Sequence, residues 1–233
     1  MAYPMTGHNG QGETEFRVYE DPFRALAETF ADLAASLDRP CVALSGGSTP
    51  KRLYTLWARD FRRAIPWSSI HLFQVDERCV PPGHPASNWR LLSDTLLGAI
   101  PEAHAYRIEA ERPGAARAYE NVLRQHVPAN NDGIPCLDVA LLGMGADGHT
   151  ASLFPGTPAL EERERLVVRN EAPQLEHARN TLTFPVLEAA HHRWFLVTGS
   201  DKADAVAAAK GGGNPAGRLS GVWFLDPGAA QGL

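Results

Sequence analysis

The sequence predicts a single α/β domain built on a mostly parallel sheet. Two observations carry this prediction. Short apolar runs alternate along the chain with longer stretches in which apolar residues recur at helical spacing. Glycine-rich or charged clusters follow four of the apolar runs, where loops leave the carboxyl ends of parallel strands. Because no repeat or linker divides the chain, we expect one domain over residues 15–233, preceded by a loose tail over residues 1–14.

The N-terminal half shows this alternation element by element. Phe16–Tyr19 predicts a short strand, and Asp21 predicts a helix cap because Pro22 can occupy the first helical position. Further along, the pattern predicts strands over Cys41–Leu44 and Ile70–Val75, a helix from Pro50 to about Phe61, and a helix capped by Ser87 that carries Trp89, Leu92 and Leu96. The charged cluster Asp76–Arg78, taken alone, is typical of a solvated loop.

The C-terminal half continues in the same way. Ala115–His126 has helical spacing, and Asn130–Gly133 is typical of a turn. The remaining pattern predicts strands over Leu137–Leu142, near Leu166–Arg169 and Thr181–Phe184, and over Arg193–Val197 and Val222–Leu225, with a helix over Lys202–Lys210 before the loop Gly211–Pro215.

Composition argues against several classes of protein. Hydrophobic residues make up 44% of the 233 residues, enough for a sizeable core. The formal net charge of −5 argues against nucleic acid as the main partner, because phosphate backbones need clustered Lys and Arg. No apolar run reaches the length of a membrane span, and the N-terminus lacks the basic-then-apolar order of a signal peptide. We therefore expect no membrane partner and a cytoplasmic location, while the oligomeric state stays open.

Cysteine and histidine usage gives no sign of a metal site or a disulfide framework. The three cysteines, Cys41, Cys79 and Cys136, are odd in number and form no Cys-x-x-Cys pair. Cys41 and Cys136 border apolar runs, so we interpret them as small core residues. His191 and His192 are adjacent but lack a third ligand, so we interpret them as surface residues.

The cluster Ser45–Thr49 has the composition of an anion-binding loop. The glycines Gly46 and Gly47 let backbone N–H groups approach an anion, and Ser48 and Thr49 add hydroxyl donors at the start of a helix. It is not a Walker A loop, because GxxxxGK[ST] is absent. On its own the cluster is equally compatible with an ordinary strand-to-helix turn capped by Thr49.

Three cationic residues stand near predicted strand ends. Arg78 would bind an anion in bidentate fashion, through two parallel hydrogen bonds, if an anion pocket lay beside it. Arg179 lies beside a predicted strand and Lys202 begins a predicted helix, and each is otherwise typical of a surface charge. The three residues indicate a phosphate site only if the fold brings them together.

The loop after the strand Leu137–Leu142 continues GMGADGHTASLFPG, and its glycines fit the dinucleotide pattern GxGxxG. That site needs a sustained helix after its third glycine, but Pro155 and Pro158 interrupt any helix there, and Asp147 would repel a pyrophosphate. What remains is His149 on a glycine-rich loop with a carboxylate nearby, which is typical of a general base. The alternative is a solvent-exposed histidine in a turn.

Together these clusters resemble the 6-phosphogluconolactonase family. The resemblance is carried by the segments ALSGGSTPKRLY, VDERCVPPGHPASNWRLL, LLGMGADGHTASLFPG, ARNTLTFPVLEAAHHRWFLVTGSDKA and VWFLDPGAA. It extends from about Phe16 to Ala230, and GMGxDGHTASLFP is its most specific part. Amino-sugar-phosphate deaminases of the same superfamily share the glycine loop, but they have Asn-Glu-Pro where this chain has Leu153-Phe-Pro155.

The resemblance implies a Rossmann-like α/β/α sandwich that hydrolyses 6-phospho-D-glucono-1,5-lactone to 6-phosphogluconate in the oxidative pentose phosphate pathway. It implies a sugar-phosphate substrate as the small-molecule partner, with no metal and no organic cofactor. His149 would be the catalytic base, with Asp147 beside it in a role that depends on geometry. The residues implied for the phosphate are Gly47, Ser48, Thr49, Arg78, Arg179 and Lys202.

Two other functions stay open from the sequence. One is an amino-sugar-phosphate deaminase or isomerase that uses the same phosphate pocket. The other is a sugar-phosphate-binding regulator without catalysis, which would have no need of His149. For the lactonase, the sequence also leaves open whether Arg78 or a backbone N–H of a glycine loop stabilises the oxyanion.

Overall fold

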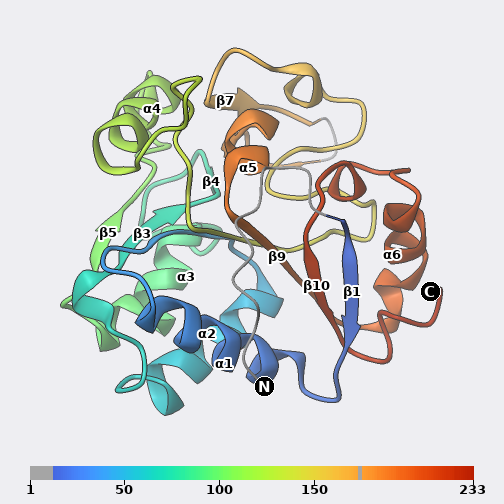
Figure 1. Cartoon of the computed structure of the whole chain (residues 1–233). Coiled ribbons are helices and arrows are strands. Elements are labelled where there is room, and N and C mark those ends of the chain that lie inside the picture. Colours follow the sequence, from blue (N-terminus) through green and yellow to red (C-terminus); the bar gives the residue numbers. More distant parts are fainter. Residues whose placement is uncertain (1–12, 173–174) are drawn as a thin grey trace.

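A parallel sheet of seven strands forms the centre of the computed structural model, which describes residues 13–172 and 175–233 (Figure 1). In spatial order the strands are β1 (Glu15–Val18), β10 (Val222–Leu225), β9 (His192–Val197), β6 (Val139–Leu142), β2 (Cys41–Leu44), β3 (His71–Gln74) and β5 (His104–Tyr106), and neighbouring strands are parallel. A second, antiparallel sheet has the order β4 (Asp76–Arg78), β8 (Arg179–Leu182) and β7 (Val167–Asn170). The predicted tail over residues 1–14 lies almost wholly outside the described residues.

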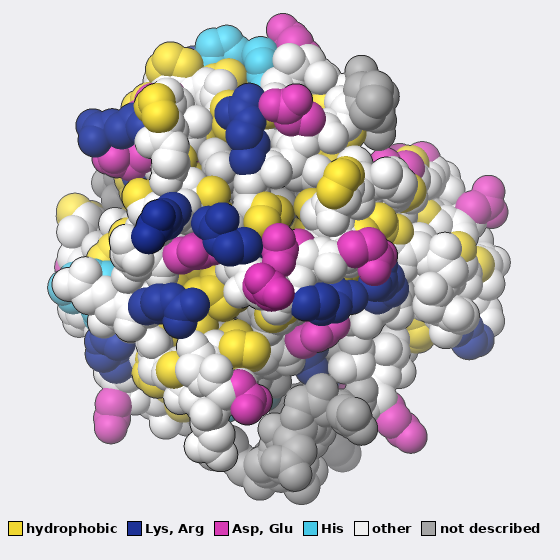
Figure 2. Space-filling view, turned by 90° about the horizontal axis from the view of Figure 1, so that it is seen from above, with side chains coloured by type: hydrophobic (Ala, Val, Ile, Leu, Met, Phe, Trp, Pro, Cys, Tyr) yellow, Lys and Arg dark blue, Asp and Glu magenta, His cyan; other side chains and the backbone are white. Residues whose placement is uncertain are grey.

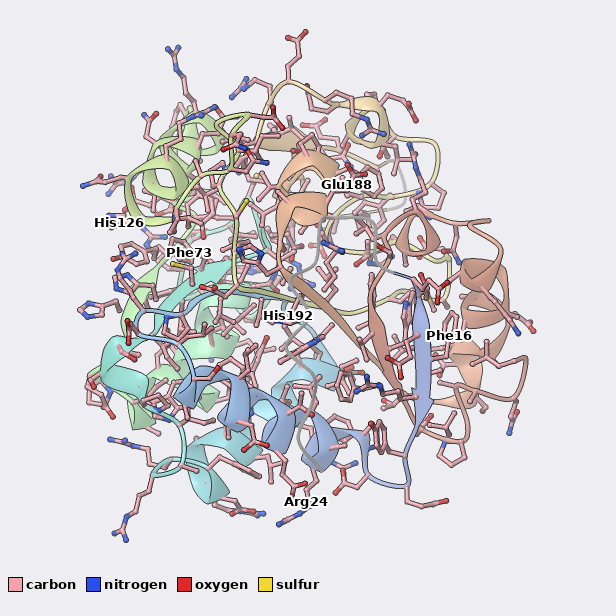
Figure 3. All side chains as sticks on the ribbon, viewed as in Figure 1. Phe16, Arg24, Phe73, His126, Glu188 and His192 are labelled. Carbon is pink, nitrogen blue, oxygen red and sulfur yellow. The ribbon has the colours of Figure 1, made fainter. Side chains whose placement is uncertain are left out.

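Helices cover both faces of the parallel sheet. One face carries α1 (Pro22–Ala35), α2 (Ser48–Asp60) and α3 (Asn88–Thr95), and the other carries α4 (Ala115–His126), α5 (Phe184–Ala189) and α6 (Ala203–Lys210). Side chains fill the space between these layers (Figure 3). Along β2, Val42 and Leu44 join the core under α1, whereas Cys41 and Ala43 join the core under α4. Burial on both faces explains the continuous apolar runs. The predicted α/β fold is therefore confirmed.

Most predicted elements agree with the structure to within a few residues. The strands β2 and β10 and the helix α4 have the predicted bounds. Both predicted helix caps are also present. Asp21 Oδ1 accepts the backbone N–H of Arg24 at 3.2 Å, and Ser87 Oγ accepts that of Arg90 at 3.2 Å.

Several features differ from the sequence pattern. The helix α2 begins at Ser48 with Gly47 as its N-cap, so Thr49 is not the cap. The pattern predicts β7 and β8 as strands but not that they form a second sheet with β4. It does not predict β5 or α5, because β5 has three residues and α5 has six, too few to show periodicity. The cluster Asp76–Arg78 is a strand rather than a solvated loop. Glu77 within it is 2% exposed, and its carboxylate accepts backbone N–H groups at the start of α3, which stabilises the buried charge.

Most of the cysteines and histidines that the sequence analysis predicts to be core or surface residues have the predicted burial. Cys41 is buried, Cys136 is only partly buried, and all three cysteines are free thiols. His191 and His192 are exposed, as predicted. Among the helices of the described residues, none combines the length and apolarity needed to cross a membrane.

A cluster of aromatic and basic side chains occupies the amino-terminal edge of the sheet, at the start of β3 and β5. His71 stacks on His104 with 4.5 Å between ring centroids. Its Nδ1 lies 3.0 Å from the Tyr106 hydroxyl and 3.1 Å from a guanidinium nitrogen of Arg39. Burial, together with the positive charge of Arg39, lowers the pKa of His71 to about 4.

We expect the free energy of unfolding to fall as the pH drops from 6.5 towards 4. In this window the unfolded chain protonates His71 while the folded state holds it neutral, so the unfolded state binds more protons. The difference between a pKa of 6.5 and one of about 4 sets an upper bound of about 3.4 kcal/mol, and solvent screening keeps the loss below that bound. Denaturant unfolding between about pH 7 and about pH 4 should show a smaller loss for His71→Gln than for the wild type. An identical pH dependence in both proteins would contradict this prediction.

Candidate active site

A cavity of about 320 Å³ lies at the carboxyl ends of β2, β6 and β9, where parallel α/β sheets bind ligands. Its walls come from the four polar clusters that the sequence singles out. The predicted site residues that line it are Gly47, Ser48, Thr49, Arg78, His149, Arg179 and Lys202. Asp147 is not part of the lining, but it is hydrogen-bonded to His149. The fold thus brings together residues that are widely separated in sequence.

The loop between β2 and α2 presents backbone donors to the cavity. Gly47 has a φ of 115°, a conformation that glycine adopts without strain. Ser48 and Thr49 form the first turn of α2, where backbone amides have no partner within the helix. Within the described part of the chain, the amides of Gly46 and Gly47 also have no backbone acceptor. The loop therefore offers N–H groups, hydroxyls and the positive end of a helix dipole to an anion.

Arg78 and Arg179 lie opposite each other in the ladder between β4 and β8, and both line the cavity. Arg78 Nη1 donates to Ala86 O at 2.7 Å, and Arg179 Nη1 donates to His177 O at 2.8 Å. Among residues 13–172 and 175–233, no carboxylate forms an ion pair with either, and Arg78 Nε is buried without a partner. Burial lowers the pKa of Arg179, and the charge of Arg78 lowers it further. An anion between these like charges would be stabilising.

Lys202 reaches the cavity from the end of β9. It closes the short 3₁₀ helix Ser200–Lys202, and its Nζ lies 3.2 Å from the exposed carboxylate of Asp201. An exposed ion pair of this kind is weak, so the ammonium can exchange this partner for the anion of a ligand. One cavity is therefore surrounded by three cationic side chains from different strand ends and by the positive end of the α2 dipole.

His149 lines the cavity from the loop after β6. Its Nδ1 lies 2.6 Å from Asp147 Oδ1, which also accepts the backbone N–H of His149 at 3.2 Å. This pairing leaves Nε2 as the ring nitrogen available to a ligand. Gly145 makes room for the pair, because a Cβ there would overlap both the imidazole and the Asp147 carboxylate. The glycines of this loop thus position a histidine.

Two neighbours define the surroundings of the imidazole. Phe154 packs on the ring of His149 with 4.3 Å between centroids, and the same phenyl ring lies 5.4 Å from the guanidinium carbon of Arg179. Burial acts to raise the pKa of Asp147, but its hydrogen bond to His149 and the charge of that residue outweigh burial and hold the pKa below its ordinary value. An ionised carboxylate on Nδ1 fixes the imidazole and stabilises the imidazolium that forms when Nε2 takes a proton.

Some residues that line the cavity are not predicted as site residues from the sequence, among them Asp76, Asn88, Ser152 and Phe154. Ser152 and Phe154 lie within the quoted loop GADGHTASLFPG, but no local pattern distinguishes them there. A signal exists for Asp76, because a residue two positions before Arg78 shares its face in a strand. Asn88 opens α3, and nothing in the local sequence indicates that it faces a cavity.

Several known proteins are similar to this chain in sequence. A family model described as glucosamine-6-phosphate isomerases/6-phosphogluconolactonase matches residues 14–222. A chloroplastic 6-phosphogluconolactonase 3 of Arabidopsis thaliana is 39% identical, over 89% of this chain and 71% of its own length. A 6-phosphogluconolactonase of Chlamydia muridarum is 42% identical, over 70% of this chain and 62% of its own length.

Solved structures show the same fold. The 6-phosphogluconolactonase of Leishmania guyanensis superposes with a TM-score of 0.85 at 26% identity, covering 95% of this chain and 99% of that one. A monomeric glucosamine-6-phosphate deaminase, at 20% identity and a TM-score of 0.77, shares the fold. By sequence and by fold, the chain belongs to the glucosamine-6-phosphate isomerase/6-phosphogluconolactonase family.

Proposed function

We propose that the chain is a hydrolase that converts 6-phospho-D-glucono-1,5-lactone to 6-phosphogluconate. The observation that carries the proposal is the His149–Asp147 pair at the wall of a cavity that also holds Arg78, Arg179 and Lys202. The cavity combines a base with an anion site. Hydrolysis of a lactone that carries a phosphate uses both, because the base activates the attacking water and the anion site binds the phosphate. Relatives named 6-phosphogluconolactonase support this choice of substrate.

A lactone is an activated ester, so water can attack it directly once a base takes the proton. In the proposed reaction, His149 Nε2 accepts a proton from water as the water oxygen bonds to C1 and the carbonyl electrons move to oxygen. The bond between C1 and the ring oxygen then breaks, and the imidazolium gives its proton to the departing ring oxygen. Asp147 holds the imidazole and offsets its positive charge between the two steps.

The oxyanion that forms at C1 needs donors that are already in place. Two kinds of donor line the cavity, the guanidinium of Arg78 and a backbone amide of a glycine loop, such as that of Gly46. We assign Arg179, Lys202 and the loop Gly47–Thr49 to the phosphate. Arg78 can serve either the phosphate or the oxyanion from its position in β4.

An amino-sugar-phosphate deaminase or isomerase is the nearest alternative, since the matching family model spans both activities. The resemblance places Asn-Glu-Pro after the Gly-His pair of the deaminases, where this chain has Leu-Phe-Pro. Here Phe154 occupies the central position of that segment and packs against His149. An apolar ring in place of a carboxylate favours the lactonase.

Two parallel assays test the proposal. The first follows 6-phosphogluconate with 6-phosphogluconate dehydrogenase and is corrected for spontaneous lactone hydrolysis. The second follows ammonia release from glucosamine 6-phosphate. We expect lactone hydrolysis well above the spontaneous rate and no ammonia. Ammonia without lactonase activity would favour the deaminase, and binding without either reaction would favour the regulator.

We expect the activity to be independent of added metal. In the part of the chain that the structure describes, no three His, Cys, Asp or Glu side chains are grouped so as to hold an ion, and the proposed chemistry uses a histidine base. Exhaustive treatment with EDTA should therefore leave the lactonase activity unchanged. Loss of activity that added zinc or magnesium restores would contradict this prediction.

The proposal includes a small-molecule partner and a cytoplasmic location. On the face seen in Figure 2, Lys and Arg side chains are interspersed with Asp and Glu, unlike the single-sign surface that binds nucleic acid. The free thiols fit a reducing compartment. Some relatives are named chloroplastic, so the cytoplasmic location stays a prediction.

A further inference from the structure

The loop that carries His149 is in contact with a second segment of the chain, Asn214–Gly217, which follows α6. The backbone N–H of Ala216 donates to Gly148 O at 3.0 Å. The Asn214 side chain packs against Gly148 so closely that a Cβ on that glycine would overlap it. Gly148 is buried and directly precedes His149. Asn214 and Ala216 thus contact the loop next to the proposed base, although neither lines the cavity.

This contact attaches the loop to the rest of the protein. Within the loop, Gly145 N–H donates to His149 O at 2.9 Å, and Gly148 N–H donates to Gly145 O at 3.0 Å. These bonds fix the residues of the loop relative to one another. In the part of the chain that the structure describes, the bond from Ala216 is the only hydrogen bond that joins residues 145–149 to another segment. The position of the loop as a unit therefore depends on the segment that contains Ala216.

Asn214 is itself fixed to α6. Its Nδ2 donates to Ala205 O at 2.7 Å, and its Oδ1 accepts the backbone N–H of Gly217 at 3.0 Å. The N–H of Gly213 also donates to Ala208 O at 2.9 Å, so the chain folds back against the helix. Because both ends of the Asn214 amide have partners, the side chain keeps one orientation and holds its segment against α6.

The same helix connects the proposed base with the proposed phosphate site. Lys202, which we assign to the phosphate, directly precedes α6 and lines the cavity. Asn214 follows the other end of α6 and contacts the loop that carries His149. A general base acts only within hydrogen-bond reach of the attacking water, and a misplacement of about 1 Å can cost about 10²-fold in rate. A rigid link between the two sites therefore serves the reaction.

Building on the proposed function, we propose that Asn214 is a positioning residue for the lactonase reaction. It fixes the segment Asn214–Gly217 to α6, and this segment holds His149 at a set distance from the cations that bind the phosphate. Asn214 acts through His149 rather than on the substrate. Loss of its side chain should therefore slow the chemistry and leave binding of the phosphate intact.

Kinetics of Asn214→Ala on 6-phosphogluconolactone test this inference, together with calorimetric titration of 6-phosphogluconate. We expect kcat to fall by about 10- to 100-fold, because the loop loses its fixed position. KM and the affinity for 6-phosphogluconate should stay within about twofold of the wild type, because the residues assigned to the phosphate are unchanged. A wild-type kcat in the folded variant, or equal losses of kcat and of product affinity, would overturn the inference.

Asn130→Ala is the matched control. Asn130 also lies in a loop, and its Oδ1 accepts the backbone N–H groups of Asp132 and Ile134 at 3.0 Å each, but it does not line the cavity. This variant should keep the wild-type kcat. If its kcat falls as far as that of Asn214→Ala, the effect belongs to any loop asparagine and the inference fails.

Asn214→Asp covers the case in which the alanine variant does not fold. Aspartate keeps the size of the side chain and the acceptor for Gly217, but it has no N–H for Ala205 O, so kcat should fall while product affinity is kept. If neither variant folds, Asn214 has a structural role and the inference fails. If the wild type does not hydrolyse the lactone above the spontaneous rate, the proposed function fails instead. The two failures are therefore distinguishable.

Discussion

Replacement of His149 by asparagine is expected to lower kcat on the phosphorylated lactone by about 10²–10⁴-fold. Asparagine is similar to histidine in size but has no basic nitrogen, so it cannot take the proton of the attacking water. Because a general base acts in the transition state, kcat should fall more than KM rises. The coupled assay, corrected for spontaneous hydrolysis, measures the effect.

The variant His149→Ala separates lost basicity from lost packing, since Phe154 packs on the imidazole. Both variants should be equally slow if basicity is what matters. A kcat close to that of the wild type in His149→Asn would reject the assignment of the base. Lost activity together with a lowered melting temperature in both variants would show instead that His149 holds its loop in place.

Removal of Arg179 or Lys202 is expected to lower kcat/KM on the phosphorylated lactone substantially. Each charge-assisted hydrogen bond to the phosphate contributes roughly 1.5–3 kcal/mol, which corresponds to about ten- to 150-fold in kcat/KM. The slow hydrolysis of unphosphorylated gluconolactone should change little, because that substrate lacks the group that these residues bind. Kinetics of Arg179→Ala and Lys202→Ala on both lactones measure the difference.

Lys210→Ala is the control for the loss of a positive charge. Lys210 is exposed at the end of α6 and does not line the cavity, so its removal should leave both rates unchanged. Equal losses on the two lactones in Arg179→Ala or Lys202→Ala would show that these residues support the fold or the chemistry rather than the phosphate.

The elements that the sequence predicts well are those whose signals are local. The helix α4 has helical spacing over its full length, and α1 and α3 begin at side-chain caps, Asp21 and Ser87. The strand β4 could not be predicted as a strand because its pairing partner is β8, about a hundred residues later. Burial of its charges depends on that pairing and on the start of α3.

The candidate site likewise contains residues with local sequence signals and residues whose role depends on contacts between distant parts of the chain. The segments that carry Arg78, His149 and Lys202 each follow a predicted strand, and the segments that follow parallel strands meet at one edge of the sheet. The spacing of Asp76 from Arg78 indicates a shared face only once this segment is known to be a strand, and the contacts of Asp76 with Ser152 and Asn88, which distinguish it from a solvated aspartate, required coordinates. Whether Asp147 lies against His149 also required coordinates, since adjacency in a loop does not set a side-chain distance.

The central claim is that the cavity separates binding from chemistry, with cations holding the phosphate and His149 moving the proton. Calorimetric titration of 6-phosphogluconate into the wild type and into His149→Asn tests this claim most directly. The account predicts similar affinity in both proteins, because the residues assigned to the phosphate are intact in the variant, although its kcat is lowered by about 10²-fold or more. Loss of product binding in a folded His149→Asn protein would contradict the account.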